Sequence, residues 1–549
     1  DYIEILGIKY CGRSMLEKVV MERGDAMKWH TDGSIAGDGF VICGESQSSS
    51  FKDYICCVPP DFPSPPAPPA SPPVPPSPPL PPLPPPLPPP AMSHWTGPIL
   101  DTFHPGVGGH GTGIVPSGAE GALVTGSFHG NASFGAHHLA SSGHQDAFVM
   151  KVSGTGAIDW AVRAGGSGDD QAFAIASDGA GGALVTGYFT GLASFGAAID
   201  AARLQSLKDT IAGFESEGRI DIVNEIYAEI AGGNFLRSKG TADMFVMHVT
   251  PMGTLDWAIQ AGSDSESTER ANGIASDFQG GAYVTGSFRG TMTYAEELAL
   301  SSPASYDDAF VMHVTSSGAI EWAVQAGGGT GSASGLAIVA DGLGGAIVTG
   351  SFEGIHQFGS TSLTSSGGSD IFVMHVTPAG TIDWAVQAGG VGGDVAHGLA
   401  EDGSGGAHVT GAFESTASFG STTFTTLGGR DIFVLHVTSV GAINWAVQAG
   451  GYGDDHGLGA STDGVGGVLV TGDFEGLAGR SASFGAYSLP TPPFTEGGPI
   501  TFVLRVNPAG SIDWAEQAGI GKGTGITSNY AGGALVTGFA DGDDVLVLR

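Results

Sequence analysis

The chain has 549 residues, with 20 lysines and arginines against 55 aspartates and glutamates, and a formal net charge of -35. This charge repels nucleic acid and anionic membrane surfaces, which disfavours a polyanionic partner. The 93 glycines and 32 prolines favour short strands and turns over long helices. No apolar run reaches the roughly 18 residues of a transmembrane helix, so the sequence predicts no membrane insertion.

Residues 1–47 have ordinary complexity and contain the words "DYIEILGIKYCG" and "MKWHTDGSIAGDGFVICG". These words resemble the C-terminal part of a CUB domain, an extracellular β-sandwich, through Asp1-Tyr2-Ile3, Tyr10-Cys11-Gly12, Thr31-Asp32, Ser34 and Gly39-Phe40. The resemblance implies a Ca²⁺ site at Asp1, Asp32 and Ser34, since oxygen ligands suit this ion. The alternative is that these side chains are solvated at the edge of the sandwich.

The four cysteines leave their pairing open. The CUB resemblance implies that the partner of Cys11 precedes this chain, and an oxidising, extracellular environment. Cys56 and Cys57 are adjacent and would bridge each other only with strain, so a bond from Cys43 to one of them is one interpretation. Reduced thiols are the other.

Residues 48–91 are predicted to form a stiff linker. Their core is "PPDFPSPPAPPASPPVPPSPPLPPLPPPLPPP". Repeated prolines favour polyproline II, which at about 3.1 Å per residue would span on the order of 100 Å. The Ser-Pro-Pro runs resemble the hydroxyproline-rich, glycosylated stalks of plant and algal wall glycoproteins. An unmodified spacer, or a ligand for proline-binding modules, is the alternative.

Residues 92–549 are built from repeats. The word Val-Thr-Gly recurs at intervals of mostly about 61 to 66 residues. Its threonines are Thr125, Thr186, Thr285, Thr349, Thr410, Thr471 and Thr537. A tryptophan recurs in step with it, at Trp95, Trp160, Trp257, Trp322, Trp384, Trp445 and Trp514.

One repeat predicts four antiparallel strands. In the repeat of Thr410 these are "AHGLAED", "AHVTGAF", "DIFVLHV" and "AINWAVQAG", with Asp-Gly turn chemistry between the first two. Four short strands per unit indicate an all-β, seven-bladed β-propeller. The phrases "DxFVxHV", "GxIxWAVQAGG" and "GGAxVTGxF" resemble the SBBP-type propeller repeat. They are also similar to the NHL and YVTN propellers, a likeness that implies that the first strand is innermost.

The two ends of the repeat region predict how the ring closes. Trp95 has no "DxFV" strand before it, and the terminal "DDVLVLR" has no tryptophan strand after it. We therefore expect the N-terminal strand to complete the last blade, with His94 facing Arg549. One repeat is longer, and its extra residues, about 198–240, show apolar residues at helical spacing. They predict one or two helices on the rim.

A histidine stands eight residues before an acid in several repeats. The flanking residues of the hairpin place His375 directly opposite Asp383, which favours a structural pair across the strands. A metal site is disfavoured because other repeats replace the histidine with Lys or Arg. The predicted pairs are His248 with Asp256, His313 with Glu321, His375 with Asp383, His436 with Asn444, Lys151 with Asp159 and Arg505 with Asp513.

Two further features are surface predictions. The acidic loops "GGSGDDQ" and "GGYGDDH" could hold Ca²⁺, but the corresponding loops "GGGTGSAS" and "GIGKGTGI" lack carboxylates, so solvated side chains are favoured. The sequon Asn131-Ala132-Ser133 predicts N-glycosylation in a surface connection.

The sequence therefore predicts a secreted or wall-associated protein without enzymatic activity. Its CUB-like part and propeller would bind extracellular proteins or glycans, as in adhesion. The alternative is a polysaccharide-active enzyme with its site at the mouth of the propeller channel, which would need paired carboxylates there. No sialidase box, Gly-x-Ser-x-Gly elbow or His-Glu-x-x-His helix is present.

Overall fold

The structure is a computed structural model, which divides into two units, Asp1–Met92 and Ser93–Arg549. The residues that it describes are 2–5, 8–10, 27–30, 109–118, 121–195, 235–263, 267–295, 298–303, 305–475, 480–491, 498–528, 533–540 and 544–548. Each unit is considered by itself.

The first unit contains a small antiparallel sheet in the order β2-β1-β3. Its strands are β1 (Tyr2–Ile5), β2 (Ile8–Tyr10) and β3 (Met27–His30). The predicted Ca²⁺ ligands Asp1, Asp32 and Ser34 lie outside the described residues. So do the proline-rich stretch and all four cysteines.

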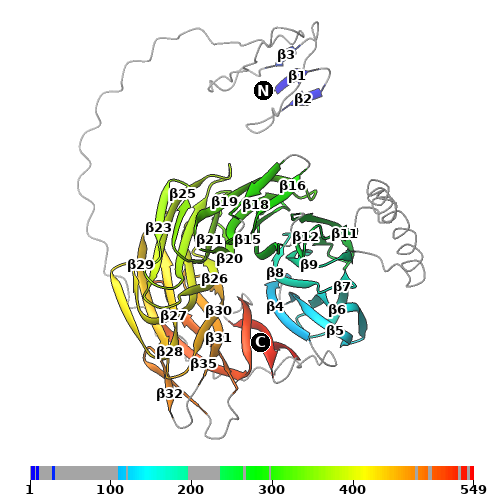
Figure 1. The fold of residues 1–549 in the computed structure, drawn as a ribbon. Coiled ribbons are helices and arrows are strands. Elements are labelled where there is room, and N and C mark those ends of the chain that lie inside the picture. Colours follow the sequence, from blue (N-terminus) through cyan, green and yellow to red (C-terminus); the bar gives the residue numbers. More distant parts are fainter. Residues whose placement is uncertain are drawn as a thin grey trace, which may run out of the picture. The chain divides into compact units, whose positions relative to one another are not determined.

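The second unit is all-β, with antiparallel sheets in a propeller-like arrangement (Figure 1). In the repeat of Thr349 the strands pair in the order β20-β21-β24-β25, which is the predicted order. These strands are β20 (Ala333–Ala340), β21 (Ala346–Phe352), β24 (Asp370–Val376) and β25 (Ile382–Gly390). We call them the first to fourth strands of a repeat.

The same order recurs in the other repeats, which we number by their Val-Thr-Gly threonines from repeat 1 (Thr125) to repeat 7 (Thr537). Repeats 1 to 3 contain β4 (Gly109–Pro116), β5 (Ala122–Phe134), β6 (His137–Val152), β7 (Ile158–Gly166); β8 (Gln171–Ser177), β9 (Ala183–Phe189), β12 (Asp243–Val249), β13 (Leu255–Ala261); β14 (Arg270–Ser276), β15 (Ala282–Phe288), β18 (Asp308–Val314), β19 (Ile320–Thr330). Repeats 5 to 7 contain β26 (Val395–Glu401), β27 (Ala407–Phe419), β28 (Thr422–Val437), β29 (Ile443–Gly450); β30 (Asp455–Thr462), β31 (Val468–Phe474), β34 (Ile500–Val506), β35 (Ile512–Ile520); β36 (Lys522–Ser528), β37 (Ala534–Ala540), β38 (Asp544–Leu548).

The connection between second and third strands carries further short strands, which the sequence did not predict. They are β10 (Leu192–Ser194), β11 (Phe235–Arg237), β16 (Thr291–Ala295), β17 (Leu298–Ser301), β22 (Ile355–Phe358), β23 (Thr361–Thr364), β32 (Ser481–Phe484) and β33 (Tyr487–Pro490). Several pair with the fourth strand of the preceding repeat, as β22 does with β19 and β32 with β29. The outer edge of one sheet is thereby covered by its neighbour.

The inserted residues fall between the second and third strands of repeat 2, β9 and β12. Residues 196–234, which hold the helical pattern, lie outside the described residues. The end of the inserted range contains the strand β11, which pairs with β10. In the part of the chain that the structure describes, no helix is long and apolar enough to cross a membrane.

The recurrent Val-Thr-Gly word has a packing explanation. Thr349 is fully buried and its hydroxyl donates to the Phe372 carbonyl at 2.8 Å, which joins the second strand to the third. A Cβ on Gly350 would overlap the carbonyl oxygen of Ser334 on the first strand. The word therefore supplies one close strand approach in every repeat and one buried hydrogen bond in each of repeats 1 to 6.

The tryptophans of the fourth strands hold neighbouring repeats together. Trp384 Nε1 donates to the Ser439 carbonyl of repeat 5 at 3.1 Å. Gly441, with φ +79°, follows in the same turn, where a Cβ would lie 2.8 Å from the indole of Trp384. The same bond links Trp160 to Pro251, Trp257 to Ser316, Trp322 to Pro378 and Trp445 to Pro508.

Candidate functional site

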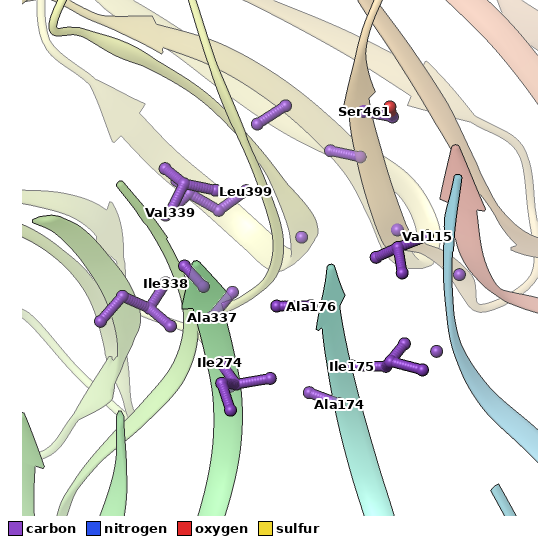
Figure 2. Close-up of a pocket in the computed structure, with 18 of the residues that line it drawn as sticks. Val115, Ala174, Ile175, Ala176, Ile274, Ala337, Ile338, Val339, Leu399 and Ser461 are labelled. Carbon is purple, nitrogen blue, oxygen red and sulfur yellow. The ribbon is translucent and has the colours of Figure 1, made fainter. Parts of the chain in front are cut away.

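First strands from all the repeats line one cavity of about 530 Å³. Its walls are formed mainly by small and branched apolar side chains, among them Val115, Ile175, Ile274, Ile338 and Leu399, which Figure 2 labels. Small and branched residues leave this space open because they extend only a short way from their strands. The cavity suits an apolar group better than a charged one.

Hydrogen bonds between neighbouring first strands hold the wall in place. Thr112 Oγ1 donates to the Ala172 carbonyl at 2.8 Å, and Asn272 Nδ2 donates to the Gly335 carbonyl at 2.8 Å. Thr524 Oγ1 donates to the Gly111 carbonyl at 2.7 Å, so the last repeat contacts the first directly.

Titratable groups are sparse in this lining. Among its described residues Glu401 is the one carboxylate, and its Oε2 accepts the Gly403 amide at 2.6 Å. His397 also lines the cavity, where burial lowers its pKa to about 4 and keeps the imidazole neutral. The lining therefore lacks the pair of carboxylates that glycoside hydrolysis uses.

Phe278 breaks the repeat pattern at the cavity mouth. It occupies the turn between first and second strands of repeat 3, lines the cavity and has 74% of its surface exposed. Its φ is +61°, in the left-handed region that bulky residues avoid. Five other repeats place glycine there with similar φ: Gly118, Gly179, Gly342, Gly403 and Gly464. Repeat 7 has Tyr530 at this position of the sequence, which lies outside the described residues.

The turn between first and second strands lies beside the turn between third and fourth strands. A Cβ on Gly344, in the first of these turns, would contact Pro378 in the second at 3.4 Å. Together these turns form what we call the turn face. Its exposed apolar residues, besides Phe278, are Met252, Leu343, Val440 and Val465.

The histidines of the predicted pairs are bridges on the turn face. His375 Nδ1 lies 2.6 Å from Asp383 Oδ1, while its Nε2 lies 2.8 Å from Oδ2 of Asp341 in the neighbouring turn. The imidazole also stacks on Trp384, with ring centroids 5.8 Å apart. Each bridge ties the two turns of a repeat together.

The register of this hairpin differs from the prediction. His375 is paired with Trp384 and Val376 with Ile382, so Asp383 occupies a β-bulge and does not face His375 directly. The contact forms because the bulge directs the Asp383 carboxylate toward the imidazole. The equal flanking distances in the sequence could not reveal an extra residue on one strand.

Related contacts occur in the other repeats. His248 contacts Asp256 and Asp178, and His313 contacts Glu321 and Asp277. Arg505 contacts Asp513 and Asp463, whereas His436 contacts Asp402 and Asn444. Lys151 faces Trp160, and among the described residues it makes no ion pair with Asp159 within 4.0 Å.

The turn aspartates were missed by the sequence analysis. Asp341 Oδ1 accepts the amides of Leu343 and Gly345 at 2.7 and 2.8 Å. Burial works to raise the pKa of Asp341, but the His375 hydrogen bond and these amides outweigh it, so the pKa is lowered. The "DGxGG" motif recurs in step with the histidines. Comparing the two positions across the repeats could have revealed the turn aspartate as the second contact of each histidine.

Two surface predictions have different outcomes. Asn131 is exposed, as a glycosylation site requires, but it lies in the strand β5 and not in a connection. The acidic loops are not simply solvated, because Asp170 and Asp455 are buried while Asp169 and Asp454 are exposed.

The described residues contain no group of three or more histidine, cysteine, aspartate or glutamate side chains placed to hold a metal ion. No protein-family model matches the chain, and no curated protein is similar to it.

Proposed function

We propose that this chain is an extracellular or wall-associated binding protein, with a seven-bladed propeller closed by its N-terminal strand and a CUB-like part before a proline-rich linker. The cavity lining supports the seven blades, since each repeat contributes its first strand. The Thr524 to Gly111 hydrogen bond supports closure between the last and first repeats. The extracellular location and the Ca²⁺ site at Asp1, Asp32 and Ser34 rest on the CUB resemblance.

Phe278 is the observation that carries the binding role. A left-handed conformation costs a bulky residue about 1–2 kcal/mol, which glycine avoids at the same turn position in other repeats. An exposed aromatic that retains such strain beside a cavity has no packing benefit to offset it. Buried aromatic anchors dominate the affinity of protein interfaces, so Phe278 is suited to insert into a partner.

The chemistry of the turn face indicates the partner. Exposed carboxylates accompany the apolar turn residues, with side-chain exposures of 56% at Asp256, 61% at Glu321 and 46% at Asp383. Because the turn face combines exposed carboxylates with exposed apolar side chains, it favours a protein segment that combines apolar side chains with lysine or arginine. Glycan binding and polysaccharide hydrolysis remain the competing functions, and the single lining carboxylate, Glu401, supports binding over hydrolysis.

An array of immobilised basic, apolar peptides tests this proposal, with a glycan array as the comparison. We expect the full chain to bind the peptides and the Phe278→Gly variant to lose at least tenfold in affinity without loss of stability. Val391→Ala, which removes an exposed apolar group from the opposite edge of the sheets, should bind normally. Binding to glycans alone, or polysaccharide cleavage lost in Glu401→Gln, would overturn the proposal.

A further inference from the structure

Buried acids meet in pairs where one repeat joins the next. The first member begins a third strand or lies within it, and the second precedes or begins the following first strand. The pairs are Asp146 with Asp170, Asp243 with Glu269, Asp370 with Asp394, and Asp431 with Asp455, and none is more than 1% exposed. They lie at the opposite ends of the strands from the turn face, and the mechanism of binding proposed above does not use them.

The pair in repeats 4 and 5 shows the arrangement. Asp370 Oδ2 accepts the Ser366 amide at 3.1 Å and Gln387 Nε2 at 2.5 Å. Asp394 accepts backbone amides on both oxygens, at 2.6 and 3.0 Å. Asp370 Oδ1 is buried and has no hydrogen-bond donor. A Cβ on Gly389 would lie 3.0 Å from this oxygen and 2.8 Å from Asp394 Oδ2, so the two carboxylates approach the same point.

The other pairs also leave one oxygen without a donor, on the first acid in two of them and on the second acid, Glu269, in the third. These atoms are Asp146 Oδ1, Asp431 Oδ1 and Glu269 Oε2. Gly165 and Gly450 lie against their pairs as Gly389 does: a Cβ on Gly165 would be 3.0 Å from Asp146 Oδ1 and 2.9 Å from Asp170 Oδ2. The arrangement is therefore a repeated feature of the joints between repeats.

Two joints without a second acid provide the internal comparison. Between repeats 3 and 4, Ala333 occupies the second position, and its amide donates to the Asp307 carbonyl as the Asp394 amide does to Ser369. There the Gly328 amide donates to Asp308 Oδ1 at 2.8 Å, so this oxygen is satisfied. Between repeats 6 and 7 the two positions are Ile500 and Gly521, and both acids are absent.

Two carboxylates that face each other away from water repel strongly, and a proton between them removes the repulsion. We infer that each acid pair binds one shared proton as a carboxyl–carboxylate hydrogen bond, and that release of this proton loosens the joint between neighbouring repeats. When Asp370 Oδ1 carries the proton, it donates to Asp394. Release to solvent leaves two buried anions and an oxygen without a donor.

The electrostatic surroundings agree with this assignment. Burial, together with the negative charge of the partner acid, raises the pKa of Asp170 and Asp455 to about 7 and that of Asp394 to about 6. Other charges also face the pairs: Glu414 raises the pKa of Asp394, whereas His456 lowers that of Asp455. Arg163 contacts Asp146 Oδ2 at 2.7 Å, and Asp169 adds negative charge near Asp170.

The direction of the pH dependence follows from these shifts. Between roughly pH 4 and pH 7 the folded pair holds a proton that the unfolded chain has released, so stability falls as pH rises. His397 and His408 oppose this trend, because burial lowers their pKa to about 4 and folding then disfavours their protonation. Because four acid pairs gain stability on acidification and only these two histidines lose it, we expect the folded chain to become more stable as pH falls from about 7 to about 4.

Infrared spectroscopy and thermal unfolding of the full chain test the proposal. From about pH 8 to about pH 5 we expect the Tm to rise by several degrees and a buried carboxyl C=O stretch to appear. If asparagine replaces the first acid, its amide oxygen can accept the hydrogen bonds that Oδ2 now accepts. Its NH₂ group then takes the place of Oδ1, the oxygen without a donor, and can donate a hydrogen bond to the second acid without a shared proton. The triple variant Asp146→Asn, Asp370→Asn, Asp431→Asn should therefore lose most of the band and flatten the pH profile.

Asp169→Asn and Asp454→Asn are the matched controls, because they remove a charge from exposed residues next to Asp170 and Asp455. Both should keep the band and the pH profile. If the triple variant does not fold, each single variant should still lose part of the band. The proposal is overturned by a Tm that does not rise toward pH 5, by absence of the band, or by stabilisation at pH 8 that follows added Ca²⁺ and reverses with chelator.

Discussion

Replacement of Thr349 by valine removes the repeated buried hydrogen bond and leaves the packing almost unchanged. The side chain is fully buried, and valine has the same shape, so no cavity forms. The Phe372 carbonyl loses the donor that lies 2.8 Å away. A buried hydrogen bond contributes about 0.5–1.5 kcal/mol net, and an acceptor left without its donor adds to the loss. We therefore expect Thr349→Val to reduce the free energy of unfolding by about 1–2 kcal/mol.

Repeat 7 supplies the matched control. Thr537 is equally buried at the same position of the Val-Thr-Gly word, but its hydroxyl has no hydrogen-bond partner. Thr537→Val removes an unsatisfied polar group, so stability should stay constant or rise by up to about 1 kcal/mol. Urea unfolding followed by tryptophan fluorescence measures both variants. Equal losses, or no loss in Thr349→Val, would refute the reasoning.

Three further changes test other contacts. Gly350→Ala places a Cβ on the Ser334 carbonyl and should cost more than about 3 kcal/mol or prevent folding, as seen by circular dichroism and urea unfolding. Asp341→Asn should cost about 1 kcal/mol at neutral pH. Because the folded pKa of Asp341 is lowered, this difference should shrink as pH falls below about 4; a constant difference would contradict the bridge. Trp384→Phe removes the hydrogen bond to Ser439 and should speed amide exchange in β28 and β29, whereas unchanged exchange would argue against this link.

The repeated pattern made the strands predictable. Each repeat alternates apolar residues and turn signals in the same order, so the order of its four main strands and their buried faces follow from local periodicity. The short strands in the connections do not. The predicted register of the outer hairpin was wrong, because the bulge at Asp383 shifts the pairing by one residue. A bulge does not alter the pattern of apolar residues, so the sequence contains no sign of it.

Comparing equivalent positions of the repeats points to candidate functional residues that no known sequence motif identifies. Phe278 stands where five other repeats have glycine. The sequence shows this difference, but it does not show that the position has a positive φ beside a cavity. Likewise, Asp394 and Asp370 are visible as recurrent acids. Their burial against each other is not visible, because they are 24 residues apart and meet only when two repeats pack.

The sequence by itself determined the repeat length, the four-strand unit and the antiparallel all-β class, because these depend on local patterns of apolar residues and turns. The tertiary structure decided which side chains share a site. Folding of a single repeat brings His375 to Asp341. Packing of adjacent repeats brings Trp384 to Ser439 of the next repeat and brings the buried acids into pairs at the joints. Such contacts depend on the distance between strands in space, which separation along the chain does not specify.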